Sequence, residues 1–389
     1  MAWSTVKWNR YYQVEDMKRL CKYFILLFAV AVASCEKPEM KPADIELLPE
    51  AGYIRFSTEV ATKAPMIESM RGRNFGVLGY EYGLNSSWEV AKALATPQTF
   101  YNQEVSCANN GVCTYDLDIS SSDLNLKRWE LAKKYSFFAY YPLMKESNGT
   151  IALSAQTAVN VPTVTYNLPF SSQPVNPNSL LDLMTAYSFD NTAGAGNVDF
   201  EFKHRLFCIE VLAQNFNTKN TIKNADGTTQ EIDAYEYISN LSLTIDNLQY
   251  QGLTVPMQKK EKEEETYLAT TPIANTNGAV TFSLLSGEEV ITVPPRSNNG
   301  IGEVSLCGPN NDRFLMLVPQ NGEIKGKVSF TLKNHAEITE TKELPFEANM
   351  SLEEGQKYNM TISFTGESVV IAMSEAGVWR AKAVNYEFE

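Results

Sequence analysis

The sequence contains few residues that could perform catalysis. Histidine occurs only twice in 389 residues, as His204 and His335. No Cys-x-x-Cys, His-Glu-x-x-His, Walker-type phosphate loop or Gly-x-Ser-x-Gly motif is present. His204 lies beside an apolar strand-like segment, where a hydrogen-bonded structural histidine is expected rather than a catalyst. The sequence therefore predicts no enzyme, no metal site and no bound cofactor.

Cations and cysteines are also scarce. Lysine and arginine number 33 against 46 acidic residues, which gives a formal net charge of −13. Such a surface repels phosphates, and this argues against nucleic acid as a partner. Of the six cysteines, Cys21 and Cys35 lie near the N-terminus. The remaining four are too few to form a disulfide scaffold in a chain of this length.

Residues 17–35 have the composition of a bacterial export signal. A basic head over 18–22 precedes an apolar run over 23–33 and small residues that lead to Cys35. The ending Val-Ala-Ser-Cys resembles the lipobox of bacterial lipoproteins. In that motif the cysteine becomes the first mature residue and carries the lipid. The resemblance implies lipidation of Cys35 and a protein displayed outside the cytoplasm.

We therefore predict a leader over residues 1–34, with the signal peptide itself at 17–34. Residues 1–16 resemble neither a leader nor a domain, and a start codon assigned too early explains them. Two alternatives are a transmembrane helix and an ordinary secretory signal in which Cys35 is incidental. The apolar run is about half of the roughly 20 residues that a membrane span needs.

The rest of the chain has the pattern of an all-β protein. Residues 35–48 are polar and contain prolines, which predicts a tether. Short segments rich in β-branched and aromatic residues follow, separated by Gly, Asn or Pro, and few stretches have helical periodicity. Strands at this spacing predict β-sandwiches. Residues 215–233 are polar, so we place a boundary there and predict sandwiches over 49–214 and 215–389. The main segments expected to form strands are 53–60, 74–82, 134–142, 198–202, 204–212, 237–245, 280–285, 314–318, 326–332, 357–364 and 369–373.

Cys107 and Cys113 flank Asn110-Gly111, which is the strongest short-range signal for a β-hairpin. In an oxidising compartment the two cysteines can form a disulfide across the hairpin. Two free thiols are the alternative.

Several short motifs follow the lipobox in a defined order. They are Ile54-Arg-Phe-Ser57, Thr62-Lys-Ala64, Phe75-Gly-Val77, Phe137-Phe-Ala-Tyr-Tyr-Pro142, Asp182-Leu-Met184, Val198-Asp-Phe-Glu-Phe-Lys-His204, Leu317-Val-Pro319 and Leu352-Glu-Glu-Gly-Gln-Lys-Tyr358. Together they resemble the fimbrillin family of Bacteroidota, which comprises subunits of type V pili and related surface lipoproteins. The resemblance implies a pair of transthyretin-like sandwiches, and a location in the outer membrane or at the cell surface within a fimbrium.

The resemblance also implies an assembly mechanism. In that family a trypsin-like protease cuts after a basic residue and removes the first strand. A strand from a neighbouring subunit then fills the groove. Here the first strand is expected around residues 54–60. The candidate cleavage residues are Lys63, Arg71, Arg73 and Arg55. Arg71 and Arg73 are expected to be the most accessible of these, because they flank a glycine in a loop.

The C-terminal residues 381–389 alternate in polarity. Val384, Tyr386 and Phe388 share one face, as the period of a strand requires. This segment is predicted to be either the last strand of the second sandwich or a donor strand for the next subunit.

Two functions remain open from the sequence. The first is a structural pilus subunit with a role in adhesion. Its partners would be other subunits through β-strand addition and outer-membrane lipid through Cys35. The second is a non-polymerising surface lipoprotein that binds carbohydrate or a host ligand. Trp88, Trp129 and Trp379 could supply a sugar platform, but isolated tryptophans are expected to pack in the core.

Overall fold

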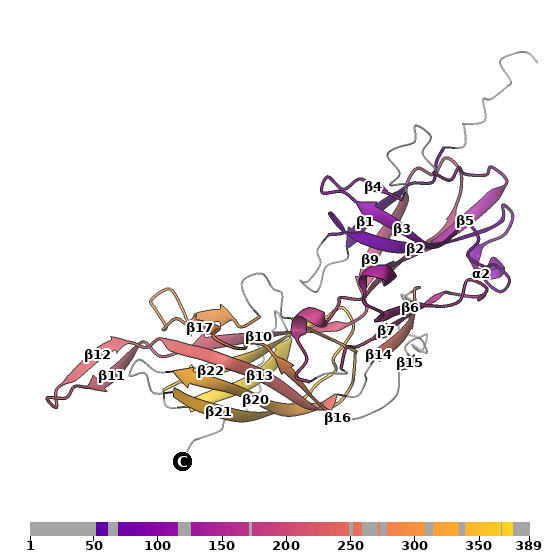
Figure 1. Cartoon of the computed structure of the whole chain (residues 1–389). Helices are drawn as coiled ribbons and strands as arrows, with labels where there is room; N and C mark the ends of the chain where they lie inside the picture. The colour runs from indigo at the N-terminus through magenta and orange to yellow at the C-terminus, as the bar shows by residue number, and fades with distance from the viewer. Residues whose placement is uncertain are drawn as a thin grey trace, which may run out of the picture. The chain divides into compact units, whose positions relative to one another are not determined.

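The structure is a computed structural model, and it describes ten stretches of the chain. They are residues 52–60, 69–115, 126–170, 173–248, 252–258, 271–272, 278–307, 314–333, 339–366 and 368–375. Their regular structure is almost entirely β-strand (Figure 1). The exceptions are a four-residue helix, α2 (Trp88–Ala91), and two 3-10 turns, Met144–Glu146 and Pro177–Ser179. The all-β prediction is therefore confirmed for the described residues.

The first set of strands closes into a barrel. In order around the barrel, its strands are β1 (Phe56–Val60), β4 (Cys113–Thr114), β3 (Phe100–Cys107), β2 (Asn74–Gly83), β5 (Lys133–Tyr141), β8 (Met184–Asn191) and β9 (Val198–His204). Closure occurs because β1 pairs with β4 on one side and with β9 on the other. The β-sandwich predicted for residues 49–214 remains a prediction. The ring of pairings joins segments that are far apart in the chain, which strand periodicity does not specify.

A second sheet combines strands from both halves of the chain. It runs β15 (Thr271–Pro272), β14 (Gly252–Pro256), β7 (Thr163–Asn167) and β6 (Ile151–Leu153). The pairing of β14 with β7 extends over five residues, from Gly252↔Asn167 to Pro256↔Thr163. Strands on opposite sides of the predicted boundary at residue 215 are therefore hydrogen-bonded to one another.

Two further sheets contain most of the remaining strands. One is formed by β18 (Gly302–Ser305), β10 (Phe207–Asn215), β22 (Lys357–Thr365) and β23 (Ser368–Glu375), with β19 (Leu315–Leu317) also paired to β10. The other is formed by β16 (Gly278–Ser283), β13 (Glu236–Leu248), β20 (Glu323–Lys333) and β21 (Thr339–Asn349), with β17 (Val290–Val293) also paired to β13. We call these two sheets the C-terminal sheets.

β10 gives the physical boundary between the barrel and the C-terminal sheets. This strand ends at Asn215, yet its partners β18, β19 and β22 all lie later in the chain. Strand pairing therefore changes from the barrel to the C-terminal sheets between β9 and β10, at residues 204–207. The division of the chain into two domains remains a prediction, and these pairings favour a boundary there rather than at residue 215.

β11 (Lys219–Lys223) and β12 (Thr229–Asp233) form a two-stranded hairpin that pairs with no other described strand. Its turn contains Asp226 and Gly227. The Asp226 carboxylate accepts a hydrogen bond from the backbone N–H of Thr228 at 2.9 Å, and Gly227 has a φ of +85°. The polar segment that the sequence marked is therefore a hairpin inserted between β10 and β13.

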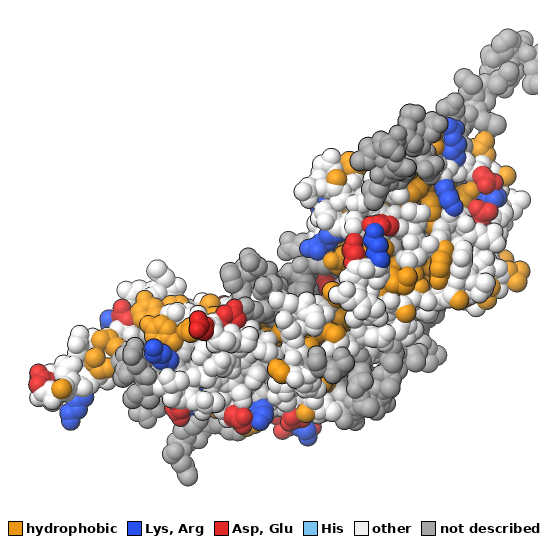
Figure 2. Space-filling model, viewed as in Figure 1, with side chains coloured by type: hydrophobic (Ala, Val, Ile, Leu, Met, Phe, Trp, Pro, Cys, Tyr) orange, Lys and Arg blue, Asp and Glu red, His pale blue; other side chains and the backbone are white. Residues whose placement is uncertain are grey.

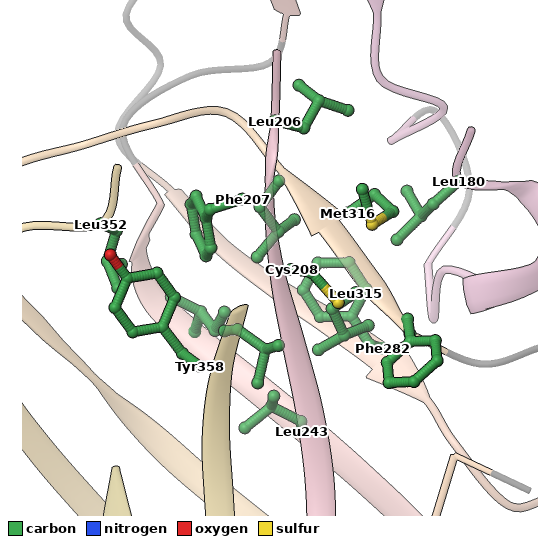
Figure 3. Packing of buried hydrophobic residues seen from close by; sticks show 14 of the residues in the cluster. Leu180, Leu206, Phe207, Cys208, Leu243, Phe282, Leu315, Met316, Leu352 and Tyr358 are labelled. Carbon is green, nitrogen blue, oxygen red and sulfur yellow. The ribbon is translucent and has the colours of Figure 1, made fainter. Parts of the chain in front are cut away.

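The buried apolar residues form two clusters. The larger one includes the faces of the C-terminal sheets, where β22 alternates strictly between buried and partly exposed residues. Figure 3 shows part of it around β10, with Phe207, Leu243 and Tyr358 among the labelled side chains. The smaller cluster lies inside the barrel and is rich in aromatic rings, including Phe75 and Phe202, whose centroids are 5.2 Å apart. Strand β1 contributes to this smaller cluster.

Candidate functional site

Strand β1 and the short segment before it are held by backbone hydrogen bonds to two different parts of the chain. The backbone N–H of Ile54 donates to Lys127 O at 2.8 Å, and that of Trp129 donates to Gly52 O at 3.0 Å. Further along, β1 runs parallel to β9 over five residue pairs, beginning at Phe56↔Val198. On its other side β1 pairs with β4 at a single position. The first strand is therefore bonded firmly to one neighbour and weakly to the other.

The side chain of Phe56 occupies an aromatic pocket inside the barrel. Only 3% of Phe56 is exposed. Its ring centroid lies 5.4 Å from that of Phe200 in a stacked arrangement, and 5.6 Å from that of Phe137 in an edge-on arrangement. Phe100 and Tyr115 complete the pocket at 6.0 and 5.7 Å. Burial of a phenylalanine in such a site contributes roughly 3 kcal/mol or more to stability.

We use the name first-strand groove for β4, β9 and the four rings of Phe100, Tyr115, Phe137 and Phe200. The Tyr115 hydroxyl also contacts the backbone just before β1 and the backbone of Lys127. It donates to Ile54 O at 3.1 Å and accepts from the backbone N–H of Lys127 at 2.8 Å. The groove therefore presents both a backbone edge and a deep apolar pocket to the strand that occupies it.

The β3–β4 hairpin forms one side of the groove. Cys107 and Cys113 are disulfide-bonded in the structure. Between them, Asn110 accepts a hydrogen bond from the backbone N–H of Val112 at 3.0 Å, and Gly111 has a φ of +87°. Positive φ values favour glycine, so the Asn-Gly sequence suits this turn.

The candidate cleavage residues differ in their surroundings. Arg55 is exposed, but its carbonyl accepts a hydrogen bond from Val198 N at 2.8 Å, within the paired region of β1. Arg73 donates to the Tyr141 hydroxyl at 3.2 Å, and its carbonyl accepts from Cys107 N at 3.0 Å. Arg71 is exposed, and Gly72 after it donates to Cys107 O at 2.7 Å. Arg71 and Arg73 thus lie together at the end of the disulfide-bonded hairpin.

The remaining predicted site residues lie outside the described residues. These are the lipidation candidate Cys35, the cleavage candidate Lys63, and the donor-strand candidates Val384, Tyr386 and Phe388. The tryptophan of the sugar-platform hypothesis at position 379 also lies outside them. Trp88 and Trp129 are buried, with 1% and 4% exposed, so neither can present a ring to a sugar.

His204 is a buried structural residue, as its sequence context predicts. Its Nδ1 lies 2.9 Å from a carboxylate oxygen of Asp182, and both side chains are 1% exposed. No group of three or more potential metal ligands occurs in the described part of the chain. Within the same residues, no helix is long and apolar enough to cross a membrane.

Sequence reasoning did not identify Arg205, which lies where the chain passes from β9 to β10. Its buried guanidinium donates to Glu354 and to the Thr185 hydroxyl, each at 3.1 Å, and to Pro256 O at 3.2 Å. An arginine between two apolar strand segments gives no sequence signal for these partners, because all three are distant in the chain. The arrangement ties together segments of the barrel, β14 and the loop before β22.

The described part of the chain thus defines an all-β protein whose first strand occupies a groove between two neighbours, and it contains no recognised catalytic centre. The chain belongs to the fimbrillin-like family, whose model matches residues 86–379. Membership in this family makes it a fimbrial or adhesin-like protein of the cell surface. The matched region begins after β2, so it contains the whole first-strand groove but not β1.

One solved structure has a TM-score above 0.5 and shares the fold, and others are similar at lower scores. A fimbrial protein from Bacteroides vulgatus has 17% sequence identity and a TM-score of 0.55, and the match covers 82% of this chain and 98% of that protein. A putative cell adhesion protein from Bacteroides ovatus has 15% identity and a TM-score of 0.44, over 87% and 99% of the two chains. One from Bacteroides uniformis has 14% identity and a TM-score of 0.43, over 83% and 97%. No curated protein matches the sequence.

Proposed function

We propose that this chain is a structural subunit of a cell-surface pilus that assembles by β-strand exchange. The observation that carries the proposal is the position of β1. This strand is terminal among the described strands, closes the barrel, and places Phe56 in a pocket built by other strands. In this proposal the chain folds as two tandem transthyretin-like domains, and proteolysis after a basic residue releases β1.

Removal of β1 would leave a surface that binds another strand. The edge of β9 would present its backbone N–H and C=O groups over the five positions that β1 now pairs. The rings of Phe100, Tyr115, Phe137 and Phe200 would face an empty pocket. An exposed sheet edge beside an apolar pocket favours β-augmentation, because both the hydrogen bonds and the buried area are recovered on binding.

The contacts of the basic residues favour Arg71 as the cleavage position. A protease must draw several residues of its substrate into an extended conformation, away from their own sheet. Arg55 lies within the paired region, and Arg73 is engaged by Tyr141. Arg71 is exposed and precedes the first paired residue of β2. Lys63 remains a second candidate on sequence grounds.

The C-terminal segment is the proposed donor. Val384, Tyr386 and Phe388 alternate with polar residues, and this spacing suits a strand that places apolar side chains in the groove of the next subunit. The alternative is that this segment forms the last strand of its own chain. Deletion of residues 381–389 distinguishes the two. Loss of polymer with an unchanged melting temperature of the monomer supports donation. Strong destabilisation of the monomer contradicts it.

Strand exchange is tested by limited trypsin digestion of the exported chain, followed by a labelled synthetic peptide with the sequence of residues 52–60. We expect the first cut between residues 63 and 73, and uptake of the peptide by the cut chain only. The variant K63A/R71A/R73A should resist this cut, whereas Lys219→Ala, an exposed cation on the β11–β12 hairpin, should be cut normally. Equal cutting along the whole chain, or no uptake after the cut, would contradict the proposal.

Export as a lipoprotein is the second part of the proposal. A diacylated Cys35 would anchor the chain in the outer membrane, since each buried methylene adds about 0.8 kcal/mol. Cys35→Ala should abolish labelling by a palmitate analogue and remove the protein from the outer-membrane fraction. Unchanged labelling would show that the lipid is not on Cys35.

A pocket on the outer side of β13 and β16 supports the alternative, a surface lipoprotein that binds a neutral, hydroxyl-rich ligand. The pocket has a volume of about 440 Å³ and no charged residue in its lining. Its polar groups include the side chains of Gln173, Asn240, Ser242, Ser283 and Ser286. Binding of neutral oligosaccharides on a glycan array, lost in S242A/S283A, would favour this function. Polymer formation without such binding would favour the pilus subunit.

A further inference from the structure

One wall of the first-strand groove is too short to be held by backbone pairing alone. Strand β4 consists of Cys113 and Thr114. It pairs with β3 at Cys107↔Cys113 and Ser106↔Thr114, and with β1 at Phe56↔Cys113. Even a complete isolated two-stranded hairpin is only marginally stable in water. The position of β4 therefore depends on contacts beyond these few pairs, among them the packing of the neighbouring Tyr115 ring against Phe100 and the disulfide.

The disulfide connects Cys113 of β4 to Cys107, whose backbone is held by hydrogen bonds that do not involve β1. The backbone N–H of Cys107 donates to Arg73 O at 3.0 Å, and its carbonyl accepts from Gly72 N at 2.7 Å. Both partners belong to the segment that leads into β2. Cys107 keeps these anchors when β1 is released by a cut after Lys63 or Arg71, and the bond to Cys113 transmits that position to β4.

Strand β1 covers the disulfide directly. The hydroxyl oxygen of Thr58 lies 4.0 Å from the sulfur of Cys107 and 3.9 Å from that of Cys113. The two cysteines are 2% and 7% exposed with β1 in place. Release of β1 would therefore uncover the disulfide and at the same time remove one of the strands that pair with β4.

We propose that the Cys107–Cys113 disulfide keeps β4 in position while the first-strand groove is empty, so that uptake of an incoming strand depends on the oxidised state. This inference rests on the proposed strand exchange. The two cysteines are positioning residues, since they act by fixing the groove wall. The occupant is a β-strand of a second copy of this chain, with a large apolar side chain for the Phe56 pocket and a small one beside the disulfide.

The test compares strand uptake by the oxidised and the reduced groove. The full exported chain is cut with trypsin and titrated with the labelled 52–60 peptide, either oxidised or in dithiothreitol. Dithiothreitol gives two electrons and two protons to the pair of sulfur atoms, which become thiols, and is itself oxidised to its cyclic disulfide. We expect reduction to raise the Kd for the peptide about tenfold or more, because the short loop loses its constraint.

Two variants separate this role from a general effect on folding. C107S/C113S should bind the peptide as weakly as the reduced chain, while the uncut variant, in which β1 still covers β4, should remain folded. Val112→Thr changes an exposed residue of the same hairpin and leaves the disulfide intact. Its Kd for the peptide should equal that of the parent chain, both in the oxidised state and in dithiothreitol.

The outcomes distinguish this inference from the function on which it rests. Equal peptide affinity for the oxidised and reduced cut chain overturns the role of the disulfide and leaves strand exchange intact. Failure of the oxidised cut chain to bind the peptide at all overturns both. If C107S/C113S does not fold, the comparison of the oxidised and reduced parent chain decides the question.

Discussion

The barrel and the C-terminal sheets are both built by pairing of distant strands, but β1 of the barrel is paired at fewer positions than the long strands of the C-terminal sheets. β20 and β21 pair over eleven positions, and β10 and β22 over eight. In the barrel, β1 pairs with β4 at one position and with β9 over five. β1 therefore has fewer paired positions to lose than β10 or β20. This difference supports the proposal that β1 is the strand that exchanges.

The composition of the two cores follows the same division. The barrel core brings together aromatic rings around a few positions, so that one side chain of β1 meets four rings. The C-terminal sheets bury many aliphatic residues spread over their length, which include Ile209, Val211, Leu243 and Ile245. Removal of β1 would therefore take one aromatic side chain away from all four rings at once.

Exposed charges lie over both regions, including over β20 and β21 (Figure 2). Lys327 and Glu343 form an exposed ion pair at 3.2 Å between these two strands. Pairs of this kind contribute about 0–1 kcal/mol. We therefore expect the cores and the backbone pairing, rather than these ion pairs, to set the stability of each region.

The largest effect is expected at Arg205, where segments of both regions meet. Arg205→Ala removes the buried guanidinium from its ion pair with Glu354, in which the two side chains are 1% and 15% exposed, and from the Thr185 hydroxyl and Pro256 O. We expect the free energy of unfolding to fall by about 3–5 kcal/mol. Urea denaturation followed by circular dichroism measures this loss.

Lys325→Ala is the matched control, because it breaks an exposed pair with Glu323 at 3.3 Å. Its expected cost is below about 1 kcal/mol. Equal effects of the two substitutions would show that the buried pair contributes no more to stability than an exposed pair.

The next effect compares one phenylalanine from each region. Phe330 is fully buried in the C-terminal sheets, where its ring centroid lies 6.3 Å from that of Phe364. Phe330→Ala should lower the free energy of global unfolding by about 3–5 kcal/mol. Phe56→Ala removes the same group from the groove, and its main result should be faster amide hydrogen exchange in residues 52–60, with a smaller change in global stability.

Hydrogen exchange with peptide-level mass spectrometry, combined with thermal unfolding, distinguishes the two variants. Slow exchange of β1 in the Phe56→Ala variant would contradict the view that this strand is held mainly by its aromatic anchor.

The smallest expected effect is a pH dependence of stability that arises from Glu236 in the C-terminal sheets. Burial raises the pKa of Glu236, at the start of β13, from its ordinary value of 4.5 to about 7. The folded state therefore binds more protons than the unfolded state between these values, and stability falls as the pH rises through this window. Because Glu236 is partly exposed, we expect a loss of ~1 kcal/mol between pH 4.5 and pH 7.5.

Glu236→Gln should remove this pH dependence and stabilise the chain above pH 7, as measured by melting temperatures across the pH range. The same substitution at the exposed Glu323 serves as the control and should leave the profile unchanged. An unaltered profile in Glu236→Gln would assign the dependence to other groups.

The amino-acid pattern predicted many of the segments that become strands and which of their residues are buried, but it did not predict β3, β7 or β21. Alternation in Val198-Asp-Phe-Glu-Phe202 predicts β9, and its burial follows that alternation in the structure. The spacing of Cys107, Asn110-Gly111 and Cys113 predicts the turn between β3 and β4 in the same way. These features are local, since side-chain period and turn chemistry act within a few residues.

Tertiary structure alone decided which strands pair. The closure of the barrel by β1, the assignment of β10 to the C-terminal sheets, and the pairing of β7 with β14 join segments that are far apart in the chain. So do the rings around Phe56 and the partners of Arg205. Alternation of polar and apolar residues predicts on which face of the sheet each side chain lies. It does not predict which strand pairs with which, because all strands have the same backbone hydrogen-bonding groups. Packing of the complete chain selects among those edges.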